Sequence, residues 1–245
     1  FIDQHVMTKG SDKPFFLYYC SQAGHSPYSP PISFNVKDPL KTDDLAASGA
    51  IPIAGTTINK RTDMIREGDA AIGLFIEKLK SLGVFQNTLI VFTSDNGGML
   101  NRGGQRAWRR GHRLNGDLFG FKFDAWEGGH RVPFIVRWPE KIEAGTTSDH
   151  ISAFWDILPA CAELAGTGVP EGIDGLSMVP SLLGRSNEQE KHASLYWEFR
   201  DKQAVRMGDW KGVRPEGQRG GLELYDLERD VGEQEDLSRQ HPEIS

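Results

Sequence analysis

Two oxygen-bearing side chains, Asp95 and Asn96, follow directly after residues 88–93, a β-branched and apolar run that is typical of a central strand. In open α/β sheets, ligand sites lie beyond the carboxyl ends of the strands. A carboxylate and an amide oxygen suit Ca²⁺ or Mg²⁺, and Gly97 and Gly98 would let the chain turn sharply. The alternative interpretation is an ordinary turn that caps the strand without a metal.

Two further residues could act on an anionic group. Lys122 lies four positions before the segment Trp126-Glu-Gly-Gly-His-Arg, where a lysine could hold an anion as a point charge; otherwise it is an exposed loop residue. His25 follows the apolar run of residues 14–20 and could donate a proton to a leaving group near neutral pH. Otherwise it is a surface or hydrogen-bonded histidine.

An arginine-rich loop comes between these segments. It contains Arg102, Arg106, Arg109, Arg110, His112 and Arg113. One interpretation is a cationic rim that attracts polysulfated glycans, with Arg113 as a substrate contact. The other is a solvated loop whose arginines pair with local acids. Because the loop directly follows the candidate metal ligands, we expect it near the mouth of the same pocket.

The elements that must position these residues follow an α/β pattern. Residues 14–20 are predicted to form a buried strand, residues 62–82 a helix with apolar positions at helical spacing, and residues 88–93 the next strand. The order strand, helix, strand predicts a parallel sheet with right-handed crossovers. Residues 132–138 are a further strand candidate, and the stretch from 29 to 60, broken by Pro and Gly, is predicted to be irregular.

A second helix is predicted over residues 154–165, with Asp156 as its N-cap and Gly166 at its end. Cys161 lies in this helix and Cys20 ends the first apolar run. Because a chain of this length does not need a disulfide to stabilise its fold, we expect two buried thiols instead.

The end of the chain has a different pattern. Residues 204–213 indicate a hairpin with a two-residue turn, and residues 222–227 a third strand. The acidic stretch from residue 233 is expected to close as a short helix. We therefore expect two parts: residues 1–189 in an α/β layer, and residues 190–245 in a small antiparallel subdomain.

The composition excludes several classes of protein. With 38% hydrophobic and 25% charged residues over 245 positions, the sequence is ordinary for a folded, soluble chain. The net charge of -6 argues against nucleic acid as a partner. No run approaches the roughly 18–20 apolar residues that would span a bilayer.

Taken together, the motifs resemble the sulfatase family of the alkaline-phosphatase-like superfamily, over nearly the whole chain. The matching segments are Pro14-Phe-Phe-Leu-Tyr with His25-Ser-Pro, Asn87-Thr-Leu-Ile-Val-Phe-Thr-Ser-Asp-Asn-Gly-Gly, Lys122 with Trp126-Glu-Gly-Gly-His-Arg-Val-Pro-Phe, Ala204-Val-Arg-Met-Gly-Asp-Trp-Lys, and Leu222-Glu-Leu-Tyr-Asp-Leu. The resemblance implies the C-terminal part of a sulfatase-type mixed or parallel sheet flanked by helices, with a small antiparallel α+β subdomain.

The resemblance also implies roles for single residues in the hydrolysis of sulfate monoesters, with a sulfated sugar or an aryl sulfate as substrate. Asp95 and Asn96 would be ligands of a divalent cation, usually Ca²⁺, with Mg²⁺ possible. Lys122 would contact the sulfate group. His25 would contact the sulfate and the bridging oxygen and help the leaving group depart. Cation and lysine together would neutralise charge in the transition state.

One part of the family's pattern is absent from these 245 residues. Sulfatases use a formylglycine made from Cys or Ser in a Cys/Ser-x-Pro/Ala-x-Arg segment, and neither Cys20, Cys161 nor any serine fits it. We therefore expect this chain to be a C-terminal portion, with the formylglycine in a missing N-terminal part. By itself it should have little or no activity, and a truncated sheet edge should favour self-association.

Two other functions remain open at this level. The same scaffold serves phosphodiesterases and phosphonate monoester hydrolases, and the missing nucleophile segment is what mostly separates them. A non-catalytic remnant that binds a sulfated ligand is the alternative outside the enzymes. The family's members are mostly exported or lysosomal, so the resemblance implies a periplasmic or secreted protein.

Overall fold

The computed structural model describes residues 1–10, 13–34, 51–100 and 102–245. They form two compact units, Phe1–Thr88 and Leu89–Ser245, and each unit is described by itself. The domain boundary predicted near residue 190 stays a prediction. None of the helices in the described ranges combines the length and the apolar character that crossing a bilayer requires.

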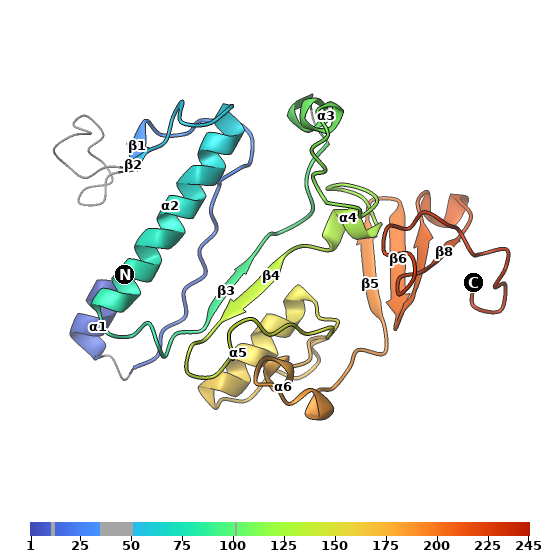
Figure 1. The fold of residues 1–245 in the computed structure, drawn as a ribbon. Helices are drawn as coiled ribbons and strands as arrows, with labels where there is room; N and C mark the ends of the chain where they lie inside the picture. The colour runs from blue at the N-terminus through green and yellow to red at the C-terminus, as the bar shows by residue number, and fades with distance from the viewer. Residues whose placement is uncertain (11–12, 35–50, 101) are drawn as a thin grey trace. The chain divides into compact units, whose positions relative to one another are not determined.

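The first unit is built around one long helix (Figure 1). A short helix, α1 (Ile2–Lys9), is followed by a two-residue strand pair, β1 (Ser33–Phe34) antiparallel to β2 (Ile51–Pro52). The long helix, α2 (Lys60–Ser81), confirms the helix predicted from the apolar spacing of residues 62–82. The side chain of Asn59 caps its start by accepting a hydrogen bond from the backbone of Thr62 at 3.0 Å.

The strand predicted for residues 14–20 is absent, and this prediction was wrong. These residues form neither helix nor strand, and Phe16, Leu17, Tyr18 and Tyr19 are exposed. A strand needs a neighbour to satisfy its backbone groups, and no described residue pairs with this run as a strand. The parallel pairing expected from it is therefore also not found: every strand pair in the described ranges is antiparallel.

The first sheet of the second unit has two strands. β3 (Ile90–Thr93) pairs antiparallel with β4 (Phe134–Arg137), with Val91 opposite Val136, and both strands confirm the predicted runs. Two short helices lie in the connection between them, α3 (Arg102–Arg109) and α4 (Glu127–His130). The segment after β3 and the helix α4 therefore belong to the same long connection between β3 and β4.

After β4 the chain forms a short 3-10 helix η1 (Phe154–Asp156), helix α5 (Ile157–Ala165), helix α6 (Val179–Leu182) and the 3-10 helix η2 (Ser186–Glu188). Helices α5 and α6 bury Ala160, Met178 and Val179, with Phe134 of β4 packed against them. This small core holds the two helices on one strand of the first sheet.

Helix α5 ends as predicted, because Gly166 adopts the left-handed conformation that favours glycine, with φ 65°. Asp156 precedes the helix but does not cap it through its side chain. Its carboxylate accepts hydrogen bonds from the backbone of Ala153 at 2.7 Å and of Leu176 at 2.9 Å, and pairs with His192 at 2.9 Å. Asp156 is fully buried, and its carboxylate connects Ala153, Leu176 and His192 instead.

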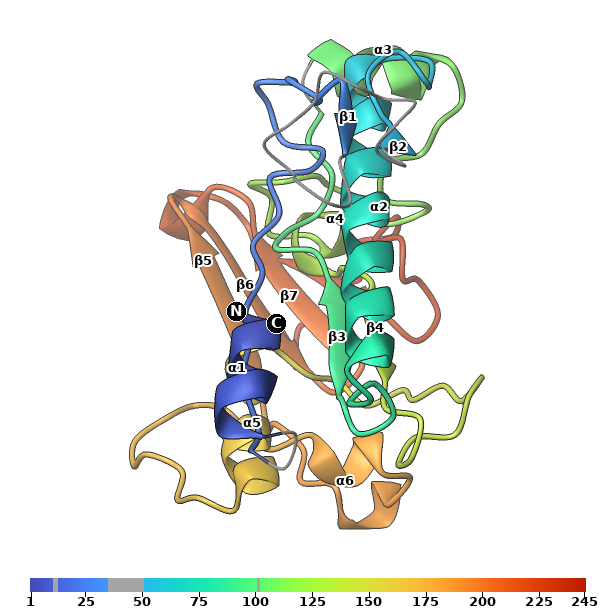
Figure 2. The same cartoon turned by 90° about the vertical axis from the view of Figure 1, so that its left-hand side faces the viewer.

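The second sheet of this unit has four antiparallel strands in sequential order, drawn in orange and red in Figures 1 and 2. They are β5 (Leu195–Phe199), β6 (Lys202–Met207), β7 (Trp210–Arg214) and β8 (Glu223–Asp226), with the 3-10 helix η3 (Gly217–Arg219) before β8. The predicted hairpin and third strand are confirmed, and β5 was missed. The acidic end forms turns rather than the expected helix.

A core cluster joins this sheet to the segment before α4. It consists of Ala125, Ala204, Val213, Tyr225 and Leu227, with Trp126 and Trp197 packed against it. The two cysteines form no disulfide, as predicted. The predicted burial holds only in part, because Cys20 is exposed and Cys161 is half-buried.

Candidate active site

The oxygen donors predicted after β3 lie at its carboxyl end. Asp95 is exposed, and its carboxylate has no hydrogen-bond or ion-pair partner in the described part of the chain. The amide nitrogen of Asn96 donates to the carbonyl of Gly97 at 2.9 Å, so its Oδ1 oxygen is left to accept from or coordinate another group. Two oxygens suited to a hard cation therefore stand side by side in sequence.

Gly97 and Gly98 bring two backbones together, which is a different role from the sharp turn predicted for them. Neither glycine has a positive φ. The backbone N–H of Gly97 donates to the carbonyl of Gly129 at 2.9 Å, and a Cβ on Gly97 would lie 1.8 Å from the oxygen of Gly128. Only glycine fits there, because real Cβ atoms do not approach a carbonyl so closely.

Lys122 is held against the same loop. Its backbone N–H donates to the carbonyl of Gly98 at 3.0 Å. The Oδ1 of Asn115 accepts from the N–H of Gly98 at 2.6 Å, and its Nδ2 donates to the carbonyl of Gly120 at 2.9 Å. The structure thus brings together the segments that carry Asp95, Asn96 and Lys122.

The turn that presents Lys122 contains a strained residue. Phe123 has a φ of 82°, a conformation that bulky side chains rarely adopt. Asp124 closes the turn by accepting from the backbone N–H of Phe121 at 2.9 Å and pairs with Lys202 of β6. The ring of Phe123 stacks on that of Phe199, with centroids 5.3 Å apart. Strands β5 and β6 therefore stabilise this turn.

A buried ionic network fixes α4 behind the turn, and sequence reasoning missed it. The ammonium group of Lys211 is fully buried and lies 2.8 Å from Glu127, 2.9 Å from Glu233 and 3.1 Å from the Nε2 of His130. Glu233 also accepts from the backbone N–H of Glu127 at 2.6 Å. A signal was present in the hairpin pattern, because Lys211 shares a strand face with the fully buried Val213.

Burial and charge shift three pKa values in this network. Burial would raise the pKa of Glu127, but the Lys211 charge and its hydrogen bond outweigh this effect and the net shift is downward. Burial and the nearby Lys211 charge lower the pKa of His130 to about 4, so the ring is neutral at physiological pH. Burial raises the pKa of Glu233 to about 7 despite the Lys211 charge. Glu127 is therefore ionised at physiological pH, whereas Glu233 is readily protonated near neutral pH.

His25 lies in the first unit, in the loop after residues 14–20, whereas the other candidates belong to the second unit. Its side chain is exposed, and Nδ1 lies 2.6 Å from the carbonyl oxygen of Ser26. Because a carbonyl only accepts, Nδ1 carries a proton in this contact.

Arg113 is exposed and does not pair with an acid in the described ranges. Its guanidinium lies 4.0 Å from the ring centroid of Trp108, a cation–π contact. The ring of Trp108 packs edge-on against Phe121, with centroids 5.7 Å apart. Arg113 is thereby linked to the residue immediately before Lys122.

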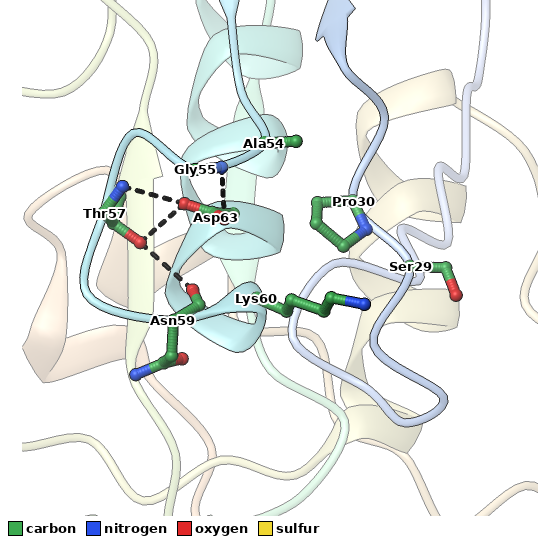
Figure 3. Close-up of a pocket in the computed structure, with 8 residues that line it drawn as sticks. All are labelled: Ser29, Pro30, Ala54, Gly55, Thr57, Asn59, Lys60 and Asp63. Carbon is green, nitrogen blue, oxygen red and sulfur yellow. Dashed lines mark hydrogen bonds between the residues drawn. The ribbon is translucent and has the colours of Figure 1, made fainter.

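A hollow in the first unit is a separate feature (Figure 3). It is lined by Ser29, Pro30, Ala54, Gly55, Thr57, Asn59, Lys60 and Asp63. The carboxylate of Asp63 accepts from the Thr57 hydroxyl at 2.7 Å and from the backbone of Gly55 at 2.8 Å, which lowers its pKa. This acid is occupied in holding the chain at the start of α2 and is not a free ligand.

The residues present fit part of a cation site. Asp95 and Asn96 offer two oxygens, whereas Ca²⁺ takes about 6–8. Among the described residues no group of three or more His, Cys, Asp or Glu side chains could hold a metal ion. A cation would need further ligands beyond these two.

Comparison with known proteins identifies relatives along the whole chain. Residues 1–167 match the family model described as Sulfatase, and residues 118–244 match N-sulphoglucosamine sulphohydrolase, C-terminal. The chain is 31% identical to an N-acetylgalactosamine-6-O-sulfatase of Bacteroides thetaiotaomicron, over 95% of this chain and 45% of the relative. It is 33% identical to human arylsulfatase A, over 82% of this chain and 36% of the relative. The chain thus spans under half the length of these curated relatives.

Solved structures agree with the fold. One, from work on the metabolism of multiple glycosaminoglycans by Bacteroides thetaiotaomicron, superposes with a TM-score of 0.75 at 26% identity, over 99% of this chain and 50% of that one. Another, Ps i-CgsB, has a TM-score of 0.73 at 28% identity, over 99% of this chain and 49% of that one. The mixed α/β fold class predicted from the sequence is confirmed.

Proposed function

This chain belongs to the sulfatase family, and from that premise we propose that it supplies part of the active site of an enzyme that hydrolyses sulfate monoesters. The observation that carries the proposal is the backbone ladder between the Asp95 loop and the Lys122 segment. The backbone N–H of Gly97 donates to the carbonyl of Gly129, and that of Lys122 donates to the carbonyl of Gly98. These hydrogen bonds connect the loop of Asp95 and Asn96 to the segment of Lys122. The relatives named above are sulfatases, which favours sulfate over phosphodiester or phosphonate substrates.

In this proposal Lys122 binds the sulfate group as a point charge and neutralises charge that builds up on its oxygens as the S–O ester bond breaks. Asp95 and Asn96 would hold a divalent cation, Ca²⁺ or Mg²⁺, whose charge adds to the same effect. A formylglycine, expected in a part of the parent enzyme outside these residues, would supply the nucleophilic oxygen. Arg113 would contact the substrate beside Lys122.

His25 would give a proton to the departing oxygen. With Nδ1–H held by the Ser26 carbonyl, the proton on Nε2 of the imidazolium is the one available for transfer. The alcohol or phenol would then leave neutral, release of sulfate would take the nucleophilic oxygen from the formylglycine, and water would replace that oxygen. The overall reaction consumes one water and yields the free hydroxyl compound and sulfate.

The substrate class and compartment are part of the same proposal. We infer a sulfated sugar or aryl sulfate as substrate, and export to the periplasm or secretion for the parent protein, because most members of this family are exported or lysosomal. We also propose that the chain alone self-associates, since Phe92 and Ile135 of the two-stranded sheet are exposed. A monomer by light scattering would contradict this last point.

The proposal is tested in the parent enzyme, with upstream sequence included, on 4-nitrophenyl sulfate. Lys122→Ala should lower kcat/KM by about 10²-fold or more, whereas Lys141→Ala, at an exposed position in the same unit, should not. Asp95→Ala should abolish thermal stabilisation by added Ca²⁺. The 245-residue chain alone should not turn over the ester, and turnover by it, or an active Lys122→Ala variant, would refute the assignment.

A further inference from the structure

The arginine-rich segment has a charge that is unusual for this chain. The chain has a net charge of -6, yet residues 99–116 contain five arginines and one histidine and no Asp or Glu. Arg106, Arg109 and Arg110 are exposed. They have no ion-pair partner in the described ranges, whereas the exposed Arg219 and Arg229 each lie 3.7 Å from an aspartate. Pairing with local acids, the simpler interpretation of the loop, is therefore not what the structure describes.

The three arginines form one surface. Helix α3 carries Arg106 and Arg109, and Arg110 directly follows it, so the three positions are spaced at i, i+3 and i+4. Residues at this spacing lie on one face of a helix, with Cβ atoms about 5–6 Å apart. Guanidinium groups so arranged can each bind an oxyanion through two parallel hydrogen bonds. We call Arg106, Arg109 and Arg110 the arginine face.

The arginine face is anchored to the candidate active site rather than held by a free loop. Trp108, on the same helix, packs against Phe121, the residue before Lys122. Gly104 fits against the carbonyl of Met99, where a Cβ would lie 2.4 Å from the oxygen. Through Asn115, the end of the loop bonds to both Gly98 and Gly120. The helix is thus tied to the segments on both sides of the site.

Within the second unit, α3 stands beyond the end of β3, away from the β5–β8 sheet, in both views (Figures 1 and 2). It extends from the strand end at which Asp95 and Asn96 lie.

We propose that the arginine face binds a further anionic group, a second sulfate, on an oligosaccharide whose scissile sulfate lies at Lys122. This inference rests on the proposed function, because it takes a sulfate ester as the substrate. The occupant is a sulfated oligosaccharide rather than a nucleic acid, since the chain as a whole is acidic, with a net charge of -6. The arginine face would select multiply sulfated chains over single sulfated rings.

The test is binding of a fluorescent chondroitin 6-sulfate hexasaccharide to the 245-residue chain at about 0.15 M salt. The variant Arg106→Ser/Arg109→Ser/Arg110→Ser should raise the Kd by about tenfold, as expected when three exposed charge contacts are lost. The control Arg219→Ser/Arg229→Ser/Arg239→Ser, with the same loss of charge on the C-terminal subdomain, should change it by less than about twofold. Circular dichroism confirms that both variants fold.

Equal Kd values for the two triple variants would overturn the proposal, as would tighter binding of a single-stranded oligonucleotide of matched charge than of the hexasaccharide. In the parent enzyme, the arginine-face variant should leave turnover of 4-nitrophenyl sulfate unchanged, because that substrate has one sulfate. A parent enzyme that turns over no sulfate ester would refute the proposed function, and the comparison of hexasaccharide binding would still decide the role of the arginine face.

Discussion

Replacing Lys211 with methionine gives the sharpest test of how the candidate site is supported. Methionine keeps an unbranched, flexible side chain in a fully buried position but removes the ammonium group. That group lies 2.8 Å from Glu127 and 2.9 Å from Glu233. Lys211→Met therefore leaves Glu233 without its cation and Glu127 with only the more distant Arg131, at 3.3 Å, and Arg206, at 3.9 Å.

The expected cost follows from this burial. Removing one partner of a buried ion pair costs about 3–5 kcal/mol, because the remaining charge has lost its compensation. Lys80→Met is the matched control: Lys80 lies at the same 2.8 Å from Glu77, but both side chains are about half exposed or more. An exposed pair contributes less than about 1 kcal/mol, so burial is the main difference between the two variants.

The pH dependence gives the prediction a sign. In the unaltered chain the pKa of Glu127 is lowered, so this pairing stabilises the fold above the ordinary pKa of 4.5 and its contribution is lost as pH falls. Without Lys211, burial is opposed only by the smaller effects of His130 and Arg206, so the pKa of Glu127 should rise. The deficit of Lys211→Met should then shrink between about pH 7.5 and about pH 5, where protonation removes the uncompensated charge.

Denaturant unfolding followed by tryptophan fluorescence measures both quantities. Trp197 stacks on His130 of the network, with centroids 4.3 Å apart, and so reports on this region. A Lys211→Met variant within about 1 kcal/mol of the unaltered chain at pH 7.5, or a deficit that grows on acidification, would refute the reasoning.

Further predictions concern Glu233 and two glycines in different surroundings. Burial holds the pKa of Glu233 at about 7, above its ordinary 4.5, so this group costs stability as pH rises through that interval. Glu233→Gln should make the denaturation midpoint less dependent on pH between those values, and an unchanged dependence would contradict it. Gly128→Ala should destabilise by at least about 2 kcal/mol, because its Cβ would lie 2.3 Å from the oxygen of Gly120. Gly73→Ala, with nothing within 4 Å, should stabilise by about 0.5–1 kcal/mol, and thermal unfolding of both checks the contrast.

The sequence predicted those elements that are stabilised locally. Helix α2 has a capping Asn59 and a periodic apolar face, and the hairpin of β6 and β7 has a two-residue turn, Gly208-Asp209. Such signals lie within a few residues of each other, so periodicity and turn chemistry suffice. The strand predicted for residues 14–20 was wrong because a strand needs a pairing partner elsewhere in the chain, and the sequence of the run does not specify that partner.

The candidate site was predicted in part for the same reason. Asp95, Asn96 and Lys122 were found through motif order, and the structure confirms only that their segments are joined. The Lys211 network was missed, since the hairpin pattern puts Lys211 on a buried face but does not show that it pairs with Glu127, 84 residues away. The contact between Gly97 and the backbone of Gly128 and Gly129 was not predicted, because a close approach between two backbones cannot be distinguished from a sharp turn in sequence alone.

The contact between Glu127 and Glu233 has a consequence for how the protein is made. The two residues are 106 positions apart, so the acid that fixes α4 is added 106 residues after Glu127. At about 5–20 residues per second, several seconds pass between the two events. During that time Glu127 and the turn before it lack their final support. An emerging chain therefore cannot complete the turn that presents Lys122 until β8 and Glu233 have left the ribosome.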